Sequence, residues 1–162
     1  MICVGIDPGL YGGIAVINEK EEVLHLFQMP VLKLKRTVFR ISVLSKLFET
    51  LKMQHNEKIE AYIEKAHSRP FDSKKGAFTN GFGYGMLQTM MEVYKIPYKI
   101  IGAKTWQKEI LKDYDKTDTK LASIEFCQRK YPDVDFVISG KKIKDGLTDA
   151  LCIALYGVKY NG

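Results

Sequence analysis

The chain has 162 residues, 46% of them hydrophobic and 27% charged, a balance typical of a folded domain that excludes an intrinsically disordered chain. Its formal net charge is +6, from 25 Lys and Arg against 19 Asp and Glu, and that sign suits a polyanionic partner. No apolar run approaches the ~20 residues that span a membrane, and the N-terminus lacks a secretory signal pattern. We therefore expect one domain over residues 1–162, soluble and cytoplasmic, without membrane contact.

The first part of the chain predicts three short strands. Ile2–Ile6, Ile14–Ile17 and Val23–Gln28 are apolar, rich in β-branched residues and separated by turn-forming segments. Strands joined by such tight turns form an antiparallel meander. After them we expect a basic connection, Met29–Arg36, and then a helix, Thr37–Gln54, in which apolar residues recur at helical spacing.

The remaining elements alternate helices with single strands. In chain order we expect a buried strand Lys58–Glu64, a polar basic connector Lys65–Gly76, a helix Ala77–Tyr94, a strand Pro97–Ile101 and helices Lys104–Leu111, Asp118–Lys130 and Gly146–Tyr160. This order predicts an α/β fold, with a mixed five-stranded sheet, half antiparallel meander and half parallel strands, flanked by helices.

The three cysteines of the chain favour a reducing compartment. Cys3, Cys127 and Cys152 are odd in number, widely spaced and set in apolar stretches. Such cysteines are typical of small core residues, and their spacing argues against a disulfide framework or a zinc site.

Four acidic residues stand at the ends of the predicted core elements. Asp7 ends the first strand, Glu64 ends the fourth, and Asp145 and Asp149 are four residues apart at the start of the last helix, on one helical face. Carboxylates that converge in a partly buried place repel one another and lose hydration, and divalent cations remove both penalties. Oxygen ligands favour a hard ion such as Mg²⁺ or Mn²⁺.

The same acids have ordinary explanations when each is considered alone. A solvated side chain or a helix cap would account for Asp149, and Asp7 before Pro8-Gly9 has its own turn chemistry. The joint pattern favours a metal site. Two ions about 4 Å apart would suit phosphodiester hydrolysis, because they can bind both the attacking and the leaving oxygen.

Several motifs together resemble the RuvC family of the ribonuclease H-like nucleases. They are Gly-Ile-Asp7-Pro-Gly, Ile-Glu64 and Lys-Asp145-Gly-x-x-Asp149-Ala-Leu, in this order from Met1 to about Gly157. Thr105-Trp106-Gln107-Lys108 and the glycine-rich segment Gly81–Leu87 are also similar to phage-type members.

The resemblance implies a homodimeric Holliday-junction resolvase, or a related nuclease for branched DNA, in a prokaryotic host, and the phage-type motifs favour a phage origin. It implies that Asp7, Glu64, Asp145 and Asp149 bind two Mg²⁺ or Mn²⁺ ions. One difference concerns the last pair, which is four residues apart here and three apart in bacterial cellular members. Asp145 could therefore support the site without binding metal itself.

Basic residues near these motifs are candidates for DNA contacts. The connector interleaves cations with Phe71, a pattern that suits phosphate binding and base stacking, and further lysines follow at helical spacing. Solvated lysines and a bare loop are the alternatives. The candidates are Lys65, Arg69, Phe71, Lys74, Lys75, Lys104, Lys108, Lys116, Lys120 and Lys144.

The glycine-rich helix is a candidate dimer interface. Gly81, Gly83 and Gly85 each cost about 1 kcal/mol relative to alanine inside a helix, which suggests a close approach of backbone to the sheet or to a partner helix. Its apolar residues lie on more than one face, so one face could cover the core and another a second subunit. Core packing alone is the alternative, and the candidate contacts are Phe82, Tyr84, Met86 and Met90.

Two other functions remain open from the sequence. A non-catalytic protein that binds branched DNA would share the basic surface but would not need four acids. Gly-Ile-Asp7-Pro-Gly followed by Gly12-Gly13 also resembles the phosphate loop of sugar kinases and actin-like ATPases, although those proteins use two such domains.

Overall fold

The computed structural model describes residues 1–67, 73–114, 117–137, 143 and 145–161. Its main sheet has five strands in the order β3-β2-β1-β6-β7. They are β1 (Ile2–Ile6), β2 (Gly13–Asn18), β3 (Val23–Gln28), β6 (Ile59–Glu64) and β7 (Tyr98–Ile101). The first three pair antiparallel, and β6 and β7 continue the sheet in parallel from β1, so the predicted mixed sheet is confirmed.

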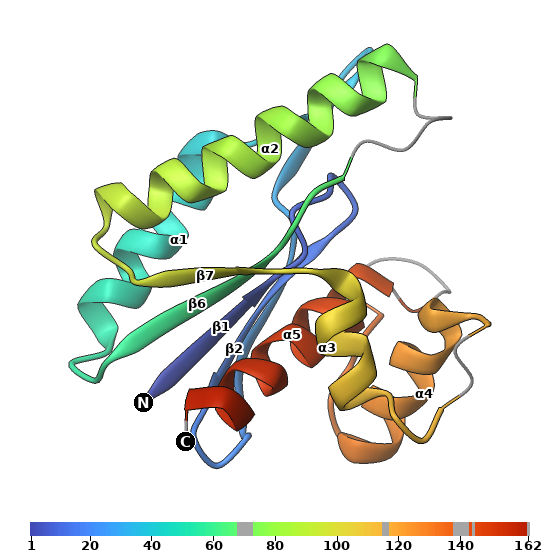
Figure 1. The fold of residues 1–162 in the computed structure, drawn as a ribbon. Helices are drawn as coiled ribbons and strands as arrows, with labels where there is room; N and C mark the ends of the chain where they lie inside the picture. The colour runs from blue at the N-terminus through green and yellow to red at the C-terminus, as the bar shows by residue number, and fades with distance from the viewer. Residues whose placement is uncertain (68–72, 115–116, 138–142, 144, 162) are drawn as a thin grey trace.

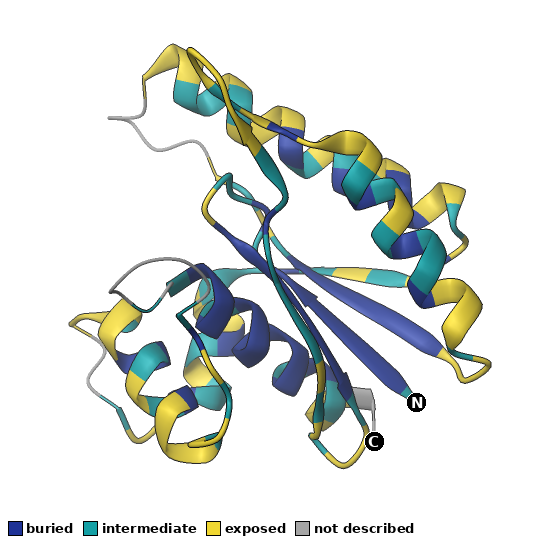
Figure 2. Ribbon diagram, turned by 180° about the vertical axis from the view of Figure 1, so that it is seen from behind, coloured by how far each residue is buried: buried dark blue, intermediate teal, exposed yellow. Residues whose placement is uncertain are grey.

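Helices cover both faces of the sheet (Figure 1). One face carries α1 (Ile41–Gln54) and α2 (Lys74–Val93), and the other carries α3 (Ala103–Ile110), α4 (Thr119–Lys130) and α5 (Asp145–Asn161). The central strands are buried on both sides, as the dark strands of Figure 2 show. This explains why they are continuous apolar runs without alternation.

Alternating residues of β1 face the two helical layers. Ile2, Val4 and Ile6 belong to the core beneath α1 and α2, whereas Cys3 belongs to the core around α5. Successive side chains of a strand point to opposite faces, so Gly5 and Asp7 share the α5 face with Cys3. The prediction that the cysteines are core residues is confirmed, because Cys3, Cys127 and Cys152 are all buried.

The segment before α1 differs from its prediction. β4 (Val31–Lys33) and β5 (Thr37–Phe39) form a small antiparallel hairpin where a connection and the first turn of a helix were expected. Val38 fitted the helical spacing of the residues that follow it, yet it is exposed and pairs with Leu32. The local preference of β-branched and aromatic residues for strands outweighed the periodicity here.

The helix after the basic connector also begins earlier than predicted. Ser73 is its N-cap, and the Ser73 hydroxyl accepts a hydrogen bond from the Gly76 backbone N–H at 3.0 Å. Lys74 and Lys75 therefore lie in the first turn of α2 and not in a connector. Among the helices that the structure describes, none is long and apolar enough to cross a membrane.

Candidate functional site

The register of the parallel strands brings Asp7 and Glu64 to one edge of the sheet. Ile6 of β1 is opposite Ile63 of β6, and the two acids are the next residues of their strands. Both fall on the face covered by α5, because side chains alternate along each strand. The predicted proximity of these two carboxylates follows from this pairing.

The start of α5 lies against the turn that follows Asp7. A Cβ atom on Gly146 would collide with the backbone of Tyr11 and Gly12, so only glycine permits this approach. Asp145 directly precedes Gly146, and Asp149 is one helical turn further along the same face. The close approach therefore brings the acids of α5 to the acids of the sheet.

Asp149 has a buried oxygen without a partner. Among the described residues no group donates a hydrogen bond to its Oδ1. The pKa of Asp149 is raised to about 7, mainly by burial and in addition by the negative charges of Asp7 and Glu64, while the Ser123 hydroxyl opposes this rise. A buried acceptor without a donor is costly, and it indicates a missing cation or proton at this place.

Asp7 is held in a similar environment. Burial raises its pKa to about 6, and repulsion from Glu64 adds to the effect. The Gly9 backbone N–H donates a hydrogen bond to Asp7 Oδ1 at 3.2 Å and lowers the pKa in part. Asp7 and Asp149 thus share a site that disfavours two uncompensated negative charges.

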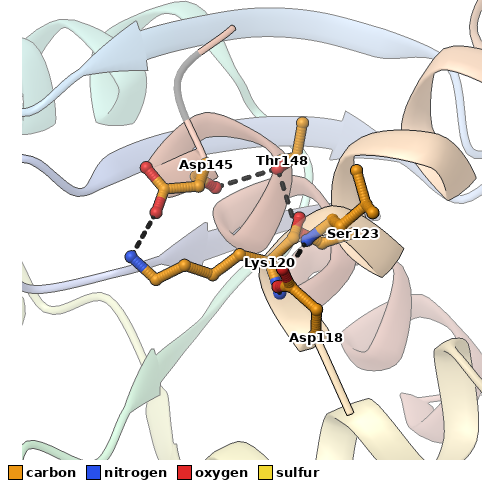
Figure 3. Close-up of polar contacts among 6 residues, drawn as sticks. Asp118, Lys120, Ser123, Asp145 and Thr148 are labelled. Atoms are coloured by element: carbon orange, nitrogen blue, oxygen red, sulfur yellow. Dashed lines mark hydrogen bonds and ion pairs between the residues drawn. The ribbon is translucent and has the colours of Figure 1, made fainter. Parts of the chain in front are cut away.

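Lys120 supplies a positive charge from α4. Its Nζ lies 2.6 Å from Asp145 Oδ2, and the contact raises the pKa of Lys120 (Figure 3). The backbone of the same helical turn is fixed by Asp118, whose side chain accepts hydrogen bonds from the N–H groups of Lys120 and Leu121. From the sequence, Lys120 was a candidate for DNA contact. In the structure it lies beside Asp145, a candidate metal ligand.

Two hydroxyls tie α4 to α5 behind this ion pair. Ser123 Oγ and Thr148 Oγ1 are 3.1 Å apart, and both residues are buried. Ser123 Oγ also lies 3.0 Å from the Lys120 carbonyl and Thr148 Oγ1 lies 2.9 Å from the Asp145 carbonyl, and each hydroxyl donates its single proton to one of these partners at a time (Figure 3). These bonds fix the spacing of Lys120 and Asp145 through the backbones that carry them.

Glu64 is held by a tryptophan. The indole Nε1 of Trp106, in α3, donates a hydrogen bond to Glu64 Oε2 at 2.7 Å. Trp106 is fully buried, so its orientation is set by packing. In the sequence, Trp106 was singled out only as part of the motif Thr105-Trp106-Gln107-Lys108. The signal that could have marked it as a site residue is that it is the single tryptophan of the chain.

All four acids line one groove of about 880 Å³. Its other walls come from the β1–β2 turn, the β4–β5 hairpin, the first turns of α2 and Lys120. A smaller pocket of about 340 Å³ adjoins Asp7 and Glu64 and includes Lys65 and His67. The sequence prediction did not include the contributions of Tyr11, Arg36, Thr37 and Asn80 to these walls.

The donor set of the groove fits a hard divalent cation, although its ligands are not closely gathered. Within the described ranges, no three side chains of His, Cys, Asp or Glu lie close enough together to form a ready-made metal site. Mutual repulsion and the pairing of Asp145 with Lys120 oppose such a cluster without a cation. The carboxylate-only chemistry and the unpartnered oxygen of Asp149 are what Mg²⁺ or Mn²⁺ would compensate.

Comparison with known proteins identifies the architecture. No protein-family model and no curated protein matched the sequence. A structure of Thermus thermophilus RuvC is similar with a TM-score of 0.66 and 16% identity, over 99% of this chain and 95% of that one. T. thermophilus RuvC in complex with Holliday junction substrate is similar with a TM-score of 0.62 and 17% identity, over 99% and 94%. The chain has the RuvC fold.

On this RuvC fold, the remaining basic candidates lie around the site in different ways. Lys75 lines the groove, and Lys65 lines the smaller pocket. Lys74, Lys104 and Lys108 are exposed but do not line these cavities. Arg69, Phe71, Lys116 and Lys144 lie outside the residues that the structure describes.

The candidate dimer residues divide between the surface and the core. Phe82 is 48% exposed, as expected of an interface residue, whereas Tyr84 and Met86 are half-buried against the core. Met90 is 7% exposed and packs within the core, so little of its side chain is available to a partner, and its role as a dimer contact stays a prediction. The helix packs by one face on the sheet, and Met90 falls on that face.

Proposed function

We propose that this protein is a metal-dependent endonuclease of the RuvC family that resolves Holliday junctions and cuts related branched DNA. The observation that carries the proposal is the groove lined by all four acids, with Asp7 after β1, Glu64 at the end of β6, and Asp145 and Asp149 on α5. The fold and the net charge of +6 support a polyanionic substrate at this groove. The T. thermophilus protein of the same fold was solved with a Holliday junction substrate.

The acids would hold two Mg²⁺ ions, with Mn²⁺ able to substitute. When bound, such ions supply an activated water and stabilise the charge of the leaving oxygen. Asp7 is central because β1 lies between the other contributors, while Glu64 and Asp149 complete the set from either side. Lys120 holds Asp145 in the metal-free protein, and a cation that takes Asp145 would release the Lys120 ammonium toward a phosphate.

A homodimer would present two such sites to two strands of a junction. Support for this comes from the outer face of α2, where Phe78 is 76% exposed and Phe82 48% exposed. On the same helix, a Cβ atom added to Gly81 or Gly85 would meet nothing within 4 Å. The glycines allow another backbone to approach closely, and the exposed aromatic rings beside them offer apolar surface for it to bury. We propose a second copy of α2 as the partner.

Two alternatives are distinguished by the same groove. A non-catalytic DNA-binding protein would not need to keep buried carboxylates such as Asp7 and Asp149, whose raised pKa values show an energetic cost. An actin-like phosphate-binding domain would account for the Gly-Ile-Asp7-Pro-Gly turn but not for the other three acids of the groove. We favour the nuclease because it gives all four acids a use.

The test is cleavage of a labelled four-way DNA junction by the purified protein with Mg²⁺, with Mn²⁺ and with EDTA. We expect symmetrical cutting that requires either metal. Asp7→Asn should abolish cutting and retain junction binding in a gel-shift assay, because it removes a ligand without removing a basic residue. If wild-type protein binds the junction and leaves it intact in both metals, the nuclease proposal is wrong.

A further inference from the structure

The β4–β5 hairpin is an exposed basic element beside the groove. Lys33, Lys35 and Arg36 are exposed at and near its tip. No Asp or Glu occurs in the sequence between Glu22 and Glu49. In the described part of the chain, none of these three cations forms an ion pair. A local charge without counter-ions in the protein favours an anionic partner.

The hairpin presents one face to the groove. Lys33 pairs with Thr37 in the register and Val31 pairs with Phe39, so these four residues share a face. Phe39 is buried and Thr37 lines the groove, which identifies this face as the inner one. Arg36, in the turn, lines the groove as well. Lys33 and Arg36 are therefore the cations of the hairpin nearest to the path of a bound ligand.

The base of the hairpin is fixed to the catalytic end of the sheet. The Met29 N–H donates to the Gly12 carbonyl at 3.0 Å, and Gly12 belongs to the turn that follows Asp7. The Arg40 N–H closes the base by donating to the Pro30 carbonyl at 2.9 Å. On the other side, Phe39 fills the space above Gly83 of α2, where any Cβ atom would collide with its ring.

The composition of the hairpin distinguishes DNA from a protein partner. Its outer face carries exposed Leu32 and Val38, and Leu34 at the tip is 66% exposed, which alone would suit either partner. The centres of protein–protein interfaces are depleted in lysine, however, whereas phosphate contacts depend on Lys and Arg. The location beside the four acids also favours the ligand whose phosphodiester those acids would attack.

We propose that the β4–β5 hairpin clamps the DNA backbone, with Lys33 and Arg36 binding phosphates of the strand that lies in the groove. The hairpin acts from the α2 side of the groove, and Lys120 acts from the side of α4 and α5. The proposal rests on the nuclease function above and assigns it a binding surface outside the acids. Because phosphate contacts carry no base information, the clamp contributes affinity for junction and linear duplex alike.

The test compares two pairs of substitutions that each lower the net charge of +6 by two. Lys33→Ala with Arg36→Ala removes the clamp. Lys20→Ala with Lys52→Ala is the matched control, since both residues are exposed and lack ion pairs with the described residues. Lys20 follows the end of β2, which pairs with the start of β1, and Lys52 is in the last turn of α1, shortly before β6 begins, so both lie toward the opposite end of the sheet. Binding of a fluorescent four-way junction is measured by anisotropy in EDTA between 50 and 200 mM salt, conditions in which no cutting occurs.

We expect the clamp variant to lose about tenfold or more in affinity, and its slope of log K against log salt to shrink by about two. The control should stay within about twofold of wild type. Lys33→Gln with Arg36→Gln keeps part of each aliphatic stem. If this variant loses as much DNA affinity as the alanine pair while its melting temperature stays unchanged, the loss comes from missing phosphate contacts and not from misfolding.

Wild-type affinity and slope in both clamp variants would overturn the proposal. Equal losses in the control would also overturn it, because they would show an effect of overall charge. Binding that depends on Lys33 and Arg36 in a protein that never cuts DNA would leave the clamp standing and remove the nuclease function.

Discussion

Trp106 donates its indole N–H to Glu64 at 2.7 Å, joining a buried residue of α3 to an acid of the groove. The bond satisfies one lone pair of Glu64 Oε2 and orients the carboxylate, which is how outer residues commonly prepare a metal ligand. Because Trp106 is the single tryptophan of the chain, all tryptophan emission of the protein comes from this residue.

Trp106→Phe should weaken metal binding by about tenfold or more while keeping the ring packed in the core. In wild type, titration with Mg²⁺ should change the tryptophan emission. Metal affinity of the variant is measured by the rise in melting temperature with added Mg²⁺. Glu64→Gln is the control, and its tryptophan emission should not respond to metal. An unchanged metal affinity in Trp106→Phe would show that the bond serves only the stability of the core.

The pKa values of Asp7 and Asp149 predict how metal-free stability depends on pH. Both are raised in the folded protein, to about 6 and about 7, above the ordinary value of 3.8. A raised carboxyl pKa stabilises the folded state fully below pH 3.8, and that contribution is lost as pH rises through 6 and 7. In EDTA, the melting temperature should therefore fall between pH 5 and pH 8 more in wild type than in Asp7→Asn/Asp149→Asn.

Metal binding should show the opposite trend with pH. The carboxylates must lose their protons before they bind Mg²⁺, so the rise in melting temperature produced by Mg²⁺ should grow from pH 5 to pH 8. The double Asn variant should show little rise at either pH. A rise of equal size at both pH values would mean that these two groups do not titrate with metal binding.

The contact between Lys120 and Asp145 predicts different effects for its two partners. Lys120→Ala removes a cation from the groove and should lower the cutting rate at saturating DNA by about tenfold or more. It should weaken Mg²⁺ binding little or not at all, because Lys120 competes for Asp145 in the metal-free state. Lys52→Ala, exposed in the last turn of α1 and outside the groove, is the control and should cut at the wild-type rate.

Asp145→Asn tests whether that acid binds metal. As a ligand, its loss should weaken the Mg²⁺-dependent rise in melting temperature as well as cutting. Normal cutting by Asp145→Asn would remove it from the ligand set and leave three acids.

Gly85 distinguishes a dimer from a monomer. A Cβ atom at this position meets nothing in the isolated chain, so Gly85→Ala should stabilise a monomer by up to about 1 kcal/mol. If two α2 helices pack closely, the same methyl group would separate them and weaken association. We expect the second result, measured by analytical ultracentrifugation over a range of concentrations. Gln128→Ala, exposed on α4 and away from α2, is the control.

The sequence by itself determined the main sheet, the two-sided arrangement of helices and the identity of the four acids. The strands of the main sheet are short apolar runs bounded by turn residues, so their positions follow from local chemistry. The proximity of Asp7 and Glu64 could be inferred because each acid stands at the end of a central strand. The fold is confirmed, and the ligand roles of the acids stay predictions.

Only the tertiary structure decided what surrounds those acids. Lys120 and Asp145 are 25 residues apart, and Trp106 and Glu64 are 42 apart, so no local pattern could pair them. The β4–β5 hairpin was missed because its residues also fit a connection and a helical period. The burial of Met90 in the core could not be foreseen, because sequence periodicity does not say which apolar face of a helix meets the sheet. Local preferences left these alternatives nearly equal in energy, and packing between distant segments decided between them.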